Sequence, residues 1–213
     1  MWSVEEVVQK ILATRDQIPR QRSVLVALSG IDASGKGYIA ARIVAGLRTR
    51  GVGVANINVD GWLNLPHKRF NPANPGEHFY LNAIRFDDLF SQLVLPLRDR
   101  RSLRIETDFA EERAPEYRRH LYEFEDVDVI VLEGIYLLRR ATQAYYDLSF
   151  WIDCSFETAL ERAKARSQEG LGPEETAAAY RTIYFPAQDL HFRRDDPRGV
   201  ATAVVNNDPR LGT

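Results

Sequence analysis

Five short apolar segments rich in β-branched residues recur along the chain, and segments with helical periodicity separate them. Strands that are apolar on both faces are typical of a parallel sheet covered by helices on each side. The pattern therefore predicts an α/β fold of three layers, α/β/α, with a five-stranded parallel sheet. The expected strands are 23–29, 52–60, 127–133, 147–153 and 200–205.

The length and charge of the chain limit the kind of protein it can be. One hydrophobic core and one domain, 1–213, are expected for a chain of 213 residues. A formal charge of -2 argues against nucleic acid as a partner. The single cysteine, Cys154, excludes an internal disulfide framework and fits a reducing compartment.

The N-terminal segment predicts an amphipathic helix over residues 3–18. Ser3 and Glu6 have the spacing of a capping box, and apolar residues recur on one helical face. Acidic residues and the absence of an unbroken apolar run argue against a signal peptide or a membrane span. We therefore expect a cytoplasmic protein that does not associate with membranes.

Two regions interrupt the alternation of strands and helices. Residues 61–82 contain three prolines and no regular period, which predicts a long loop, and their aromatic residues argue against disorder. Residues 100–125 include an alternation of apolar and charged residues that is typical of a half-buried strand. We predict a substrate loop at 61–82 and a flap or hairpin at 100–125.

The segment "LSGIDASGKGYIA" has the spacing of a phosphate-binding loop from Gly30 to Lys36. A predicted buried strand precedes it and an amphipathic helix follows it. In that arrangement, glycines let backbone N–H groups converge on phosphate at the positive end of the helix. The competing interpretation is a glycine-rich turn with a surface lysine. The predicted nucleotide-binding residues are Gly30, Asp32, Ala33, Ser34, Gly35, Lys36, Gly37 and Tyr38.

Gly37 departs from the usual pattern, in which a Ser or Thr hydroxyl at this position binds Mg²⁺. Ser34 and Tyr38 carry hydroxyls nearby, but neither stands at the motif position. Asp60 and Glu133 each end a predicted strand, and parallel sheets gather their ligand sites at the carboxyl ends of strands. These two carboxylates are the candidates to compensate for the missing hydroxyl.

The motifs together resemble the uridine kinase and phosphoribulokinase group of P-loop kinases, which includes a bacterial pantothenate kinase. The resemblance implies ATP and Mg²⁺ as cofactors and a small-molecule hydroxyl as phosphoryl acceptor. It also implies a dimer or tetramer. The matching segments are "GIDASGKG", "VDGW", "NPGEHFY", "FDDLFSQLVLPLRD", "VIVLEGIYLL", "DLSFWIDCSFETALERAKAR" and "AQDLHFRRDDPRGVATAVVNNDP".

The resemblance also implies roles for individual residues. Asp60 corresponds to the aspartate that activates the acceptor hydroxyl, as a base or through the metal, and Glu133 to the acidic residue that helps to hold Mg²⁺. Arg162 and Arg166 fall in the family's lid, around 155–172, where their spacing puts both on one helical face that could close over the phosphoryl group. The alternative for both arginines is an ordinary solvated helix face. Lys36 is expected to neutralise the terminal phosphates.

The acceptor pocket is predicted around the long loop and the flap. Arg69, His78, Phe79 and Tyr80 should lie over the same strand ends as Asp60, where the aromatic rings either stack on a substrate or anchor the loop. Asp108 corresponds to the aspartate of a Tyr-Asp signature in the uridine kinase flap, whereas the His-x-Arg signature of that flap is missing from "IETDFAEERAPEYRRH".

Three functions agree with these patterns. The first is an ATP-dependent kinase, and the second is a nucleotide-binding protein that has lost efficient transfer because of Gly37. The third, a GTPase-type switch or another P-loop ATPase, is disfavoured because "NNDP" at 206–209 lacks the lysine of a guanine-reading segment. Nucleosides, sugars, sugar phosphates and pantothenate-like alcohols all stay open as acceptors.

Overall fold

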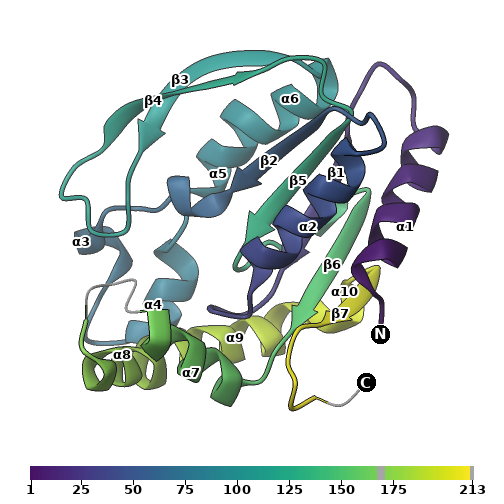
Figure 1. Ribbon diagram of the computed structural model, residues 1–213. Helices are drawn as coiled ribbons and strands as arrows, with labels where there is room; N and C mark the ends of the chain where they lie inside the picture. Colours follow the sequence, from purple (N-terminus) through teal and green to yellow (C-terminus); the bar gives the residue numbers. More distant parts are fainter. Residues whose placement is uncertain (167–170, 212–213) are drawn as a thin grey trace.

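A five-stranded parallel sheet forms the centre of the computed structural model, which describes residues 1–166 and 171–211 (Figure 1). The strands lie in the order β2-β5-β1-β6-β7, and every neighbouring pair is parallel. All five predicted strands are present. Their bounds are β1 Val24–Ser29, β2 Val54–Asn58, β5 Val129–Gly134, β6 Leu148–Asp153 and β7 Ala203–Asn206.

Helices cover both faces of the sheet, because the central strands are apolar on both sides. In β1, Val24, Val26 and Leu28 belong to one core cluster, whereas Leu25 and Ala27 belong to the other. The first core also contains α1 (Val4–Gln17) and α2 (Lys36–Arg48). The second contains α4 (Pro75–Asn82), α9 (Phe185–Asp195) and the helical run from α5 (Phe86–Asp88) through a π-helical turn (Leu89–Val94) to α6 (Leu95–Arg100). The three-layer α/β/α fold is confirmed.

The N-terminal helix begins at the predicted capping box. The Glu6 backbone N–H donates to Ser3 Oγ at 3.2 Å, and the Ser3 N–H donates back to Glu6 Oε2 at 2.7 Å. Within residues 1–166 and 171–211, we find no helix whose length and hydropathy would let it cross a bilayer.

The region 61–82 is more ordered than the sequence predicts. It contains two helices, α3 (Pro66–Arg69) and α4, where a long loop was expected. Pro66 and Pro75 are each the first residue of a helix, a position where the missing N–H costs no hydrogen bond and the fixed φ favours the helix. Two of the three prolines that indicated a loop therefore begin helices.

The region 100–125 contains an antiparallel hairpin of β3 (Leu103–Phe109) and β4 (Arg118–Phe124). Its register pairs Leu103 with Phe124 and Phe109 with Arg118, and the hairpin lies beside α6 rather than in the main sheet (Figure 1). The predicted lid, 155–172, includes α7 (Phe156–Arg166) and residues 171–172, which directly precede α8 (Pro173–Ala179). Its residues 167–170 lie outside the described residues.

The segment after the last strand fixes the start of α7. Asp208, only 3% exposed, accepts hydrogen bonds from the Ser155 N–H at 2.7 Å, from Ser155 Oγ at 2.6 Å and from Thr158 Oγ1 at 2.8 Å. Ser155 Oγ in turn accepts from the Thr158 N–H at 3.2 Å, which satisfies a backbone donor at the helix start. The C-terminal segment and the helix that carries Arg162 and Arg166 are thereby joined.

We predict that Asp208→Asn lowers the free energy of unfolding by about 1–3 kcal/mol at pH 7, because charge-assisted hydrogen bonds are lost. Burial acts to raise the pKa of Asp208, but hydrogen bonds from Ser155, Arg210 and Thr158 outweigh it and hold the pKa well below its usual range. Because the pKa of Asp208 is lower in the folded protein than in the unfolded chain, the ionised carboxylate stabilises the fold at pH values above the unfolded-state pKa of ~4. This stabilisation is lost as the pH falls from there toward the folded-state pKa.

Denaturant unfolding at pH 7 and pH 3 measures this effect, with the exposed Asp189→Asn of α9 as the matched control. The difference between wild type and Asp208→Asn should narrow at pH 3. An equal difference at both pH values would contradict the role given to the ionised carboxylate.

Candidate nucleotide and acceptor site

The loop between β1 and α2 has the backbone shape of a phosphate-binding loop. Gly35, the residue before the helix, has φ +87°, and Ala33 has φ 56°. The left-handed backbone at Gly35 favours glycine, and a Cβ there would also displace the Asn207 amide that packs against it. The start of α2, with its free N–H groups and positive dipole end, therefore faces the space beyond the carboxyl edge of the sheet.

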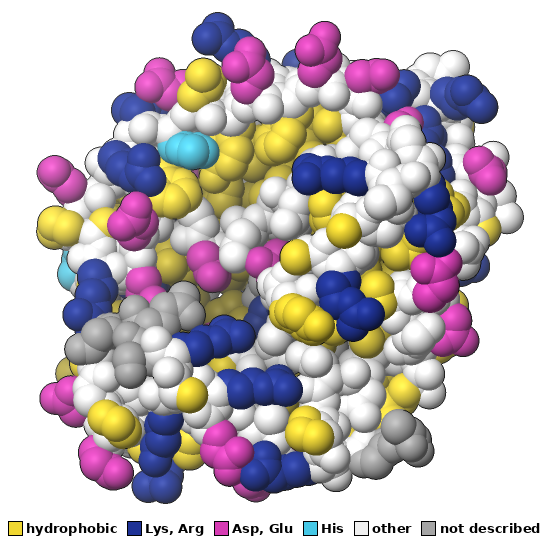
Figure 2. All heavy atoms as spheres, viewed as in Figure 1, with side chains coloured by type: hydrophobic (Ala, Val, Ile, Leu, Met, Phe, Trp, Pro, Cys, Tyr) yellow, Lys and Arg dark blue, Asp and Glu magenta, His cyan; other side chains and the backbone are white. Residues whose placement is uncertain are grey.

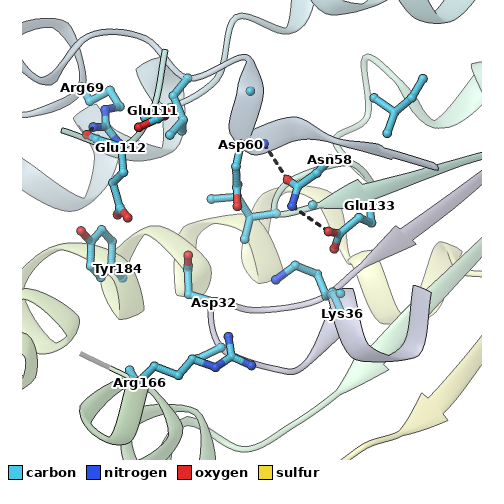
Figure 3. A pocket seen from close by; sticks show the side chains of 18 of the residues that line it. Asp32, Lys36, Asn58, Asp60, Arg69, Glu111, Glu112, Glu133, Arg166 and Tyr184 are labelled. Atoms are coloured by element: carbon cyan, nitrogen blue, oxygen red, sulfur yellow. Dashed lines mark hydrogen bonds between the residues drawn. The ribbon is translucent and has the colours of Figure 1, made fainter. Parts of the chain in front are cut away.

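Two side chains hold this loop from outside. The Ser34 carbonyl oxygen accepts from Arg162 Nη1 at 3.1 Å and from Asn207 Nδ2 at 2.7 Å, and Arg162 Nη2 donates to the Asn207 carbonyl at 2.7 Å. The structure thus places Arg162 against the back of the loop, whereas the sequence left two interpretations, closure over the phosphoryl group or a solvated helix face. Arg166, one turn later on α7, does line the cavity and reaches into it (Figure 3).

A cavity of about 1030 Å³ opens at this edge of the sheet. Figure 2 shows the face hollowed near its centre, with carboxylate side chains inside the hollow and Lys and Arg side chains around it. The P-loop, the ends of β2 and β5, the segment around α3 and α4 and the tip of the flap all contribute to its walls. Elements far apart in the sequence therefore meet at one place, as expected for ligand sites of parallel sheets.

Lys36 lies among three carboxylates in this cavity. Its ammonium donates to the Ile31 carbonyl at 2.8 Å and points toward the space between Asp32, Asp60 and Glu133 (Figure 3). Burial, which penalises the charged form, raises the pKa of each of these three carboxyls above its ordinary value. The attraction of Lys36 lowers each pKa but does not cancel the effect.

Asn58 links two of these carboxylate residues. Its Oδ1 accepts from the Asp60 N–H at 2.7 Å, and its Nδ2 donates to Glu133 Oε1 at 2.7 Å (Figure 3). Since Asn58 pairs with Glu133 in the register of β2 and β5, the amide spans adjacent strand ends. One side chain thereby fixes both the turn that carries Asp60 and the orientation of the Glu133 carboxylate.

Gly37 stands beside Glu133, where the usual motif has a hydroxyl. A Cβ at Gly37 would lie 3.5 Å from Glu133 Oε1, which is ordinary van der Waals contact. Of the two alternative hydroxyls, Ser34 Oγ is buried with no hydrogen-bond partner in the described part of the chain, and the Tyr38 side chain is 62% exposed at the cavity rim. Neither stands between Gly37 and Glu133.

The donor set of the cavity fits Mg²⁺, because carboxylate oxygens are the ligands that this hard cation prefers. Asp60 and Glu133 are the residues that would hold it. Among residues 1–166 and 171–211 no group of three or more His, Cys, Asp or Glu side chains could hold a metal ion. Two carboxylates are a sufficient protein contribution, because Mg²⁺ is usually held by one or two carboxylates together with phosphate oxygens and water.

Asp32 has a partner outside the loop. Gln188 of α9 is buried and donates from Nε2 to Asp32 Oδ2 at 2.9 Å. The Asp32 carboxyl group points toward Asp60 on the opposite wall of the cavity (Figure 3). The two side chains are close enough that the charge of Asp32 contributes to the raised pKa of Asp60. The P-loop thus contributes a carboxyl group to the cavity as well as the Lys36 ammonium.

The predicted acceptor residues divide into two groups. Arg69 is 2% exposed, donates from Nη2 to the Glu112 carbonyl, and lines the cavity together with Phe79. His78 instead contacts the Lys68 carbonyl at 2.8 Å, and the Tyr80 hydroxyl donates to Asp195 Oδ2 at 2.6 Å in the core. Asp108 pairs with Arg119 on the flap at 2.8 Å. His78, Tyr80 and Asp108 are not among the described residues that line the cavity.

Helix geometry explains this division, since consecutive residues of α4 point in different directions. Only Phe79 faces the cavity, while its neighbours face the α3 backbone and α9. The structure adds wall residues that the sequence did not single out. Among them are Asn58, Glu112 and Tyr184, and the side chain of Glu112 points down toward Tyr184 (Figure 3). Asn58 lies two residues before Asp60, so its polar side chain at the strand end was a usable signal.

Solved structures share this fold. A possible uridine kinase from Bacillus stearothermophilus is 20% identical with a TM-score of 0.73, and the match covers 94% of this chain and 96% of that chain. A proposed fructose transport system kinase from a Silicibacter species is 19% identical with a TM-score of 0.75, covering 96% and 100%. D-glycerate 3-kinase from Cryptococcus neoformans is 12% identical with a TM-score of 0.63, covering 96% and 95%.

At these identities the comparisons show the fold: the chain has the α/β/α fold of the uridine kinase-like P-loop kinases. No family model matches the sequence.

We predict that Asp32→Asn raises the melting temperature at pH 7. Burial raises the folded-state pKa of Asp32, so that the native protein binds the proton more tightly than the unfolded chain does. Stability is then lost as the pH rises from the unfolded pKa near ~4 through the folded pKa. Asparagine avoids the charge and still offers an oxygen to Gln188.

Thermal unfolding of both proteins between pH 4 and pH 8 checks this, with Asp87→Asn on α5 as the exposed control. The increase in melting temperature of Asp32→Asn over wild type should become smaller toward pH 4. A lower melting temperature for Asp32→Asn at pH 7 would mean that attraction to Lys36 outweighs the cost of burial.

Proposed function

We propose that this chain is an ATP-dependent phosphotransferase that phosphorylates a hydroxyl group of a small metabolite. The observation that carries the proposal is the cavity in which the P-loop lysine, Lys36, and a strand-end carboxylate, Asp60, face each other (Figure 3). Phosphoryl transfer depends mostly on positioning and electrostatic stabilisation. In this cavity the converging N–H groups and the Lys36 ammonium would stabilise the phosphates electrostatically. Asp60 on the opposite wall would position the acceptor hydroxyl.

In this proposal the P-loop binds the phosphates of ATP. Backbone N–H groups at the start of α2 donate to the phosphate oxygens, and the Lys36 ammonium exchanges the Ile31 carbonyl for the terminal phosphates. Arg166 supplies a second positive charge from α7. Arg162 acts indirectly, because it shapes the loop through the Ser34 carbonyl.

Asp60 is the proposed base for the acceptor hydroxyl. Its pKa is raised by burial, which brings it closer to neutral pH and makes the carboxylate a stronger base than an exposed aspartate. Asn58 fixes the backbone of Asp60 and the carboxylate of Glu133 at once. When bound, Mg²⁺ would neutralise charge on the transferring phosphates beside these two carboxylates.

The acceptor would occupy the end of the cavity opposite the P-loop. That end combines aromatic rings, such as Phe79 and Tyr184, with the charged residues Arg69 and Glu112. Aromatic faces and polar groups together suit a sugar or nucleoside, which offers both an apolar face and hydroxyls. We propose a nucleoside or sugar acceptor on this basis.

The direct test is ADP formation with Mg²⁺ and a panel of nucleosides, sugars, sugar phosphates and pantothenate-like alcohols. One acceptor should stimulate turnover. Lys36→Ala should abolish it, and Asp60→Asn should lower it by roughly 10²- to 10⁴-fold because the base is removed. Asp108→Asn is the matched control, since Asp108 pairs with Arg119 outside the cavity, and it should keep wild-type activity. A panel in which no acceptor raises ADP formation above the background would refute the proposal.

Gly37 favours a second candidate function, a nucleotide-binding protein that lacks efficient transfer and acts through conformation or partners. The motif position that would bind the metal through a hydroxyl carries no side chain, and Glu133 lies next to it. An active kinase would need other groups, such as Glu133, to bind the Mg²⁺ of the nucleotide in place of the missing hydroxyl. A protein without efficient transfer would lack such a replacement.

Restoring the hydroxyl separates the two candidates. Gly37→Ser fits, because a Cβ there meets Glu133 Oε1 at 3.5 Å. In an active enzyme the substitution should change turnover and Mg²⁺-ATP affinity by less than about 3-fold. In a degenerate site it should strengthen Mg²⁺-ATP binding by about 10-fold, the value of one added charge-assisted contact. Calorimetry with and without Mg²⁺ measures this, and Gly37→Ala adds the same Cβ without the hydroxyl as the control.

A further inference from the structure

A second cavity, of about 410 Å³, lies apart from the nucleotide cavity. It is formed by the end of α4, by α5 and by the segment that follows β5, and none of its lining residues lines the first cavity. Its wall combines apolar side chains, including the half-exposed Leu81, with the cations of Lys68, Arg85 and Arg139. The mechanism proposed above uses none of these residues.

Arg139 is the unusual residue of this cavity. Its guanidinium lies 4.2 Å from the ring centre of Tyr80, 4.9 Å from that of Phe86 and 5.4 Å from that of Tyr136. Within the described part of the chain, the Nε atom is buried without a hydrogen-bond partner. Aromatic faces attract the charge, but they do not replace the oxygen acceptors that a guanidinium has in water.

A half-buried arginine without an acceptor is costly, and such groups in native proteins call for an explanation. Burial lowers the pKa of Arg139, in agreement with a guanidinium that has lost water and gained no carboxylate close enough to compensate. The three rings hold the planar group in a fixed orientation. An oxyanion in the cavity would meet a preorganised fork of N–H donors.

The charges around Arg139 are unequal. Asp88 is engaged by Arg85 at 3.1 Å, and Arg85 also donates to the Leu63 and Asp108 carbonyls. Asp87 is exposed at the cavity edge. The wall thus carries three cations, Lys68, Arg85 and Arg139, against the two carboxylates of Asp87 and Asp88, an excess of one positive charge. Asp195, outside this wall, attracts Arg139 but does not cancel the effect of burial on its pKa.

We propose that this cavity binds a small metabolite through an oxyanion, a carboxylate or a phosphate group, with Arg139 as its anchor and Lys68 as a second cation. The planar guanidinium matches either group in a bidentate geometry. Leu81, Ile84 and Phe86 form the apolar part of the wall and would contact the carbon skeleton of the ligand.

The site adjoins the support of the flap. The Tyr117 hydroxyl, in the turn between β3 and β4, donates to Asn64 Oδ1 at 3.2 Å, and the Arg85 guanidinium lies 4.7 Å from the Tyr117 ring centre. Asn64 and Arg85 both line the second cavity. A bound anion would therefore contact the residues that hold the flap tip near the acceptor end of the first cavity.

The test uses the full chain with Lys36→Ala, so that the phosphate-binding loop is weakened and the second cavity dominates anion binding. Inorganic phosphate, glucose 6-phosphate and butyrate are titrated by calorimetry and by NMR, which separates a phosphate ligand from a carboxylate ligand. We expect saturable binding of at least one probe, and a loss of roughly 10- to 100-fold when Arg139→Met is added.

Two further variants make the result specific. Arg139→Lys keeps the charge and the aliphatic stem but loses the fork, so it should bind with intermediate affinity, and circular dichroism verifies that it folds. Arg140→Gln removes a positive charge from the adjacent, exposed arginine and should bind like its parent. The proposal is overturned if no probe binds, if Arg139→Met binds as tightly as the parent, or if Arg140→Gln loses as much as Arg139→Met.

Discussion

The site depends on one constraint, the left-handed backbone at Gly35 with Asn207 packed against it. That conformation turns the N–H groups of the loop toward the cavity and leaves the Ser34 carbonyl facing away from it, where Arg162 and Asn207 donate to it. The donors come from α7 and from the segment after β7, near the opposite end of the sequence. The shape of the loop is therefore supported by contacts from the C-terminal part of the chain, and Asp208 ties the same segment to α7.

The carboxyl groups of the cavity destabilise the fold when they are ionised. Three carboxyls face one ammonium, and burial raises the pKa of all three. Each ionised carboxylate there costs folding energy, which a bound cation would offset. Asp208, with its hydrogen bonds to Ser155 and Thr158, shows the opposite arrangement, because its ionised form stabilises the fold.

The fold could be predicted from the sequence because each central strand is apolar on both faces and helices separate the strands. Prolines were the weaker signal. Pro66 and Pro75 have the same local meaning, a backbone without an N–H, whether they lie in a loop or begin a helix. The same limit applies to the arginines of α7. A spacing of four residues puts Arg162 and Arg166 on one helical face. Only the tertiary structure shows that Arg162 donates to the Ser34 carbonyl whereas Arg166 lines the cavity.

Parts of both cavities could not be predicted because they are defined by position across the fold. Arg139 and Arg140 are adjacent and chemically identical, yet the first lies among three aromatic rings and the second is exposed. At Gly37 the sequence indicates only that a hydroxyl is missing, whereas the structure shows what adjoins the gap. Glu133 stands next to it with one oxygen held by Asn58. The second oxygen accepts no such bond in the described part of the chain, so the carboxylate stays oriented while one oxygen is available to a cation. An oriented carboxylate can take over part of the role of a hydroxyl, because a hard cation selects for oxygen ligands held in place rather than for one residue type.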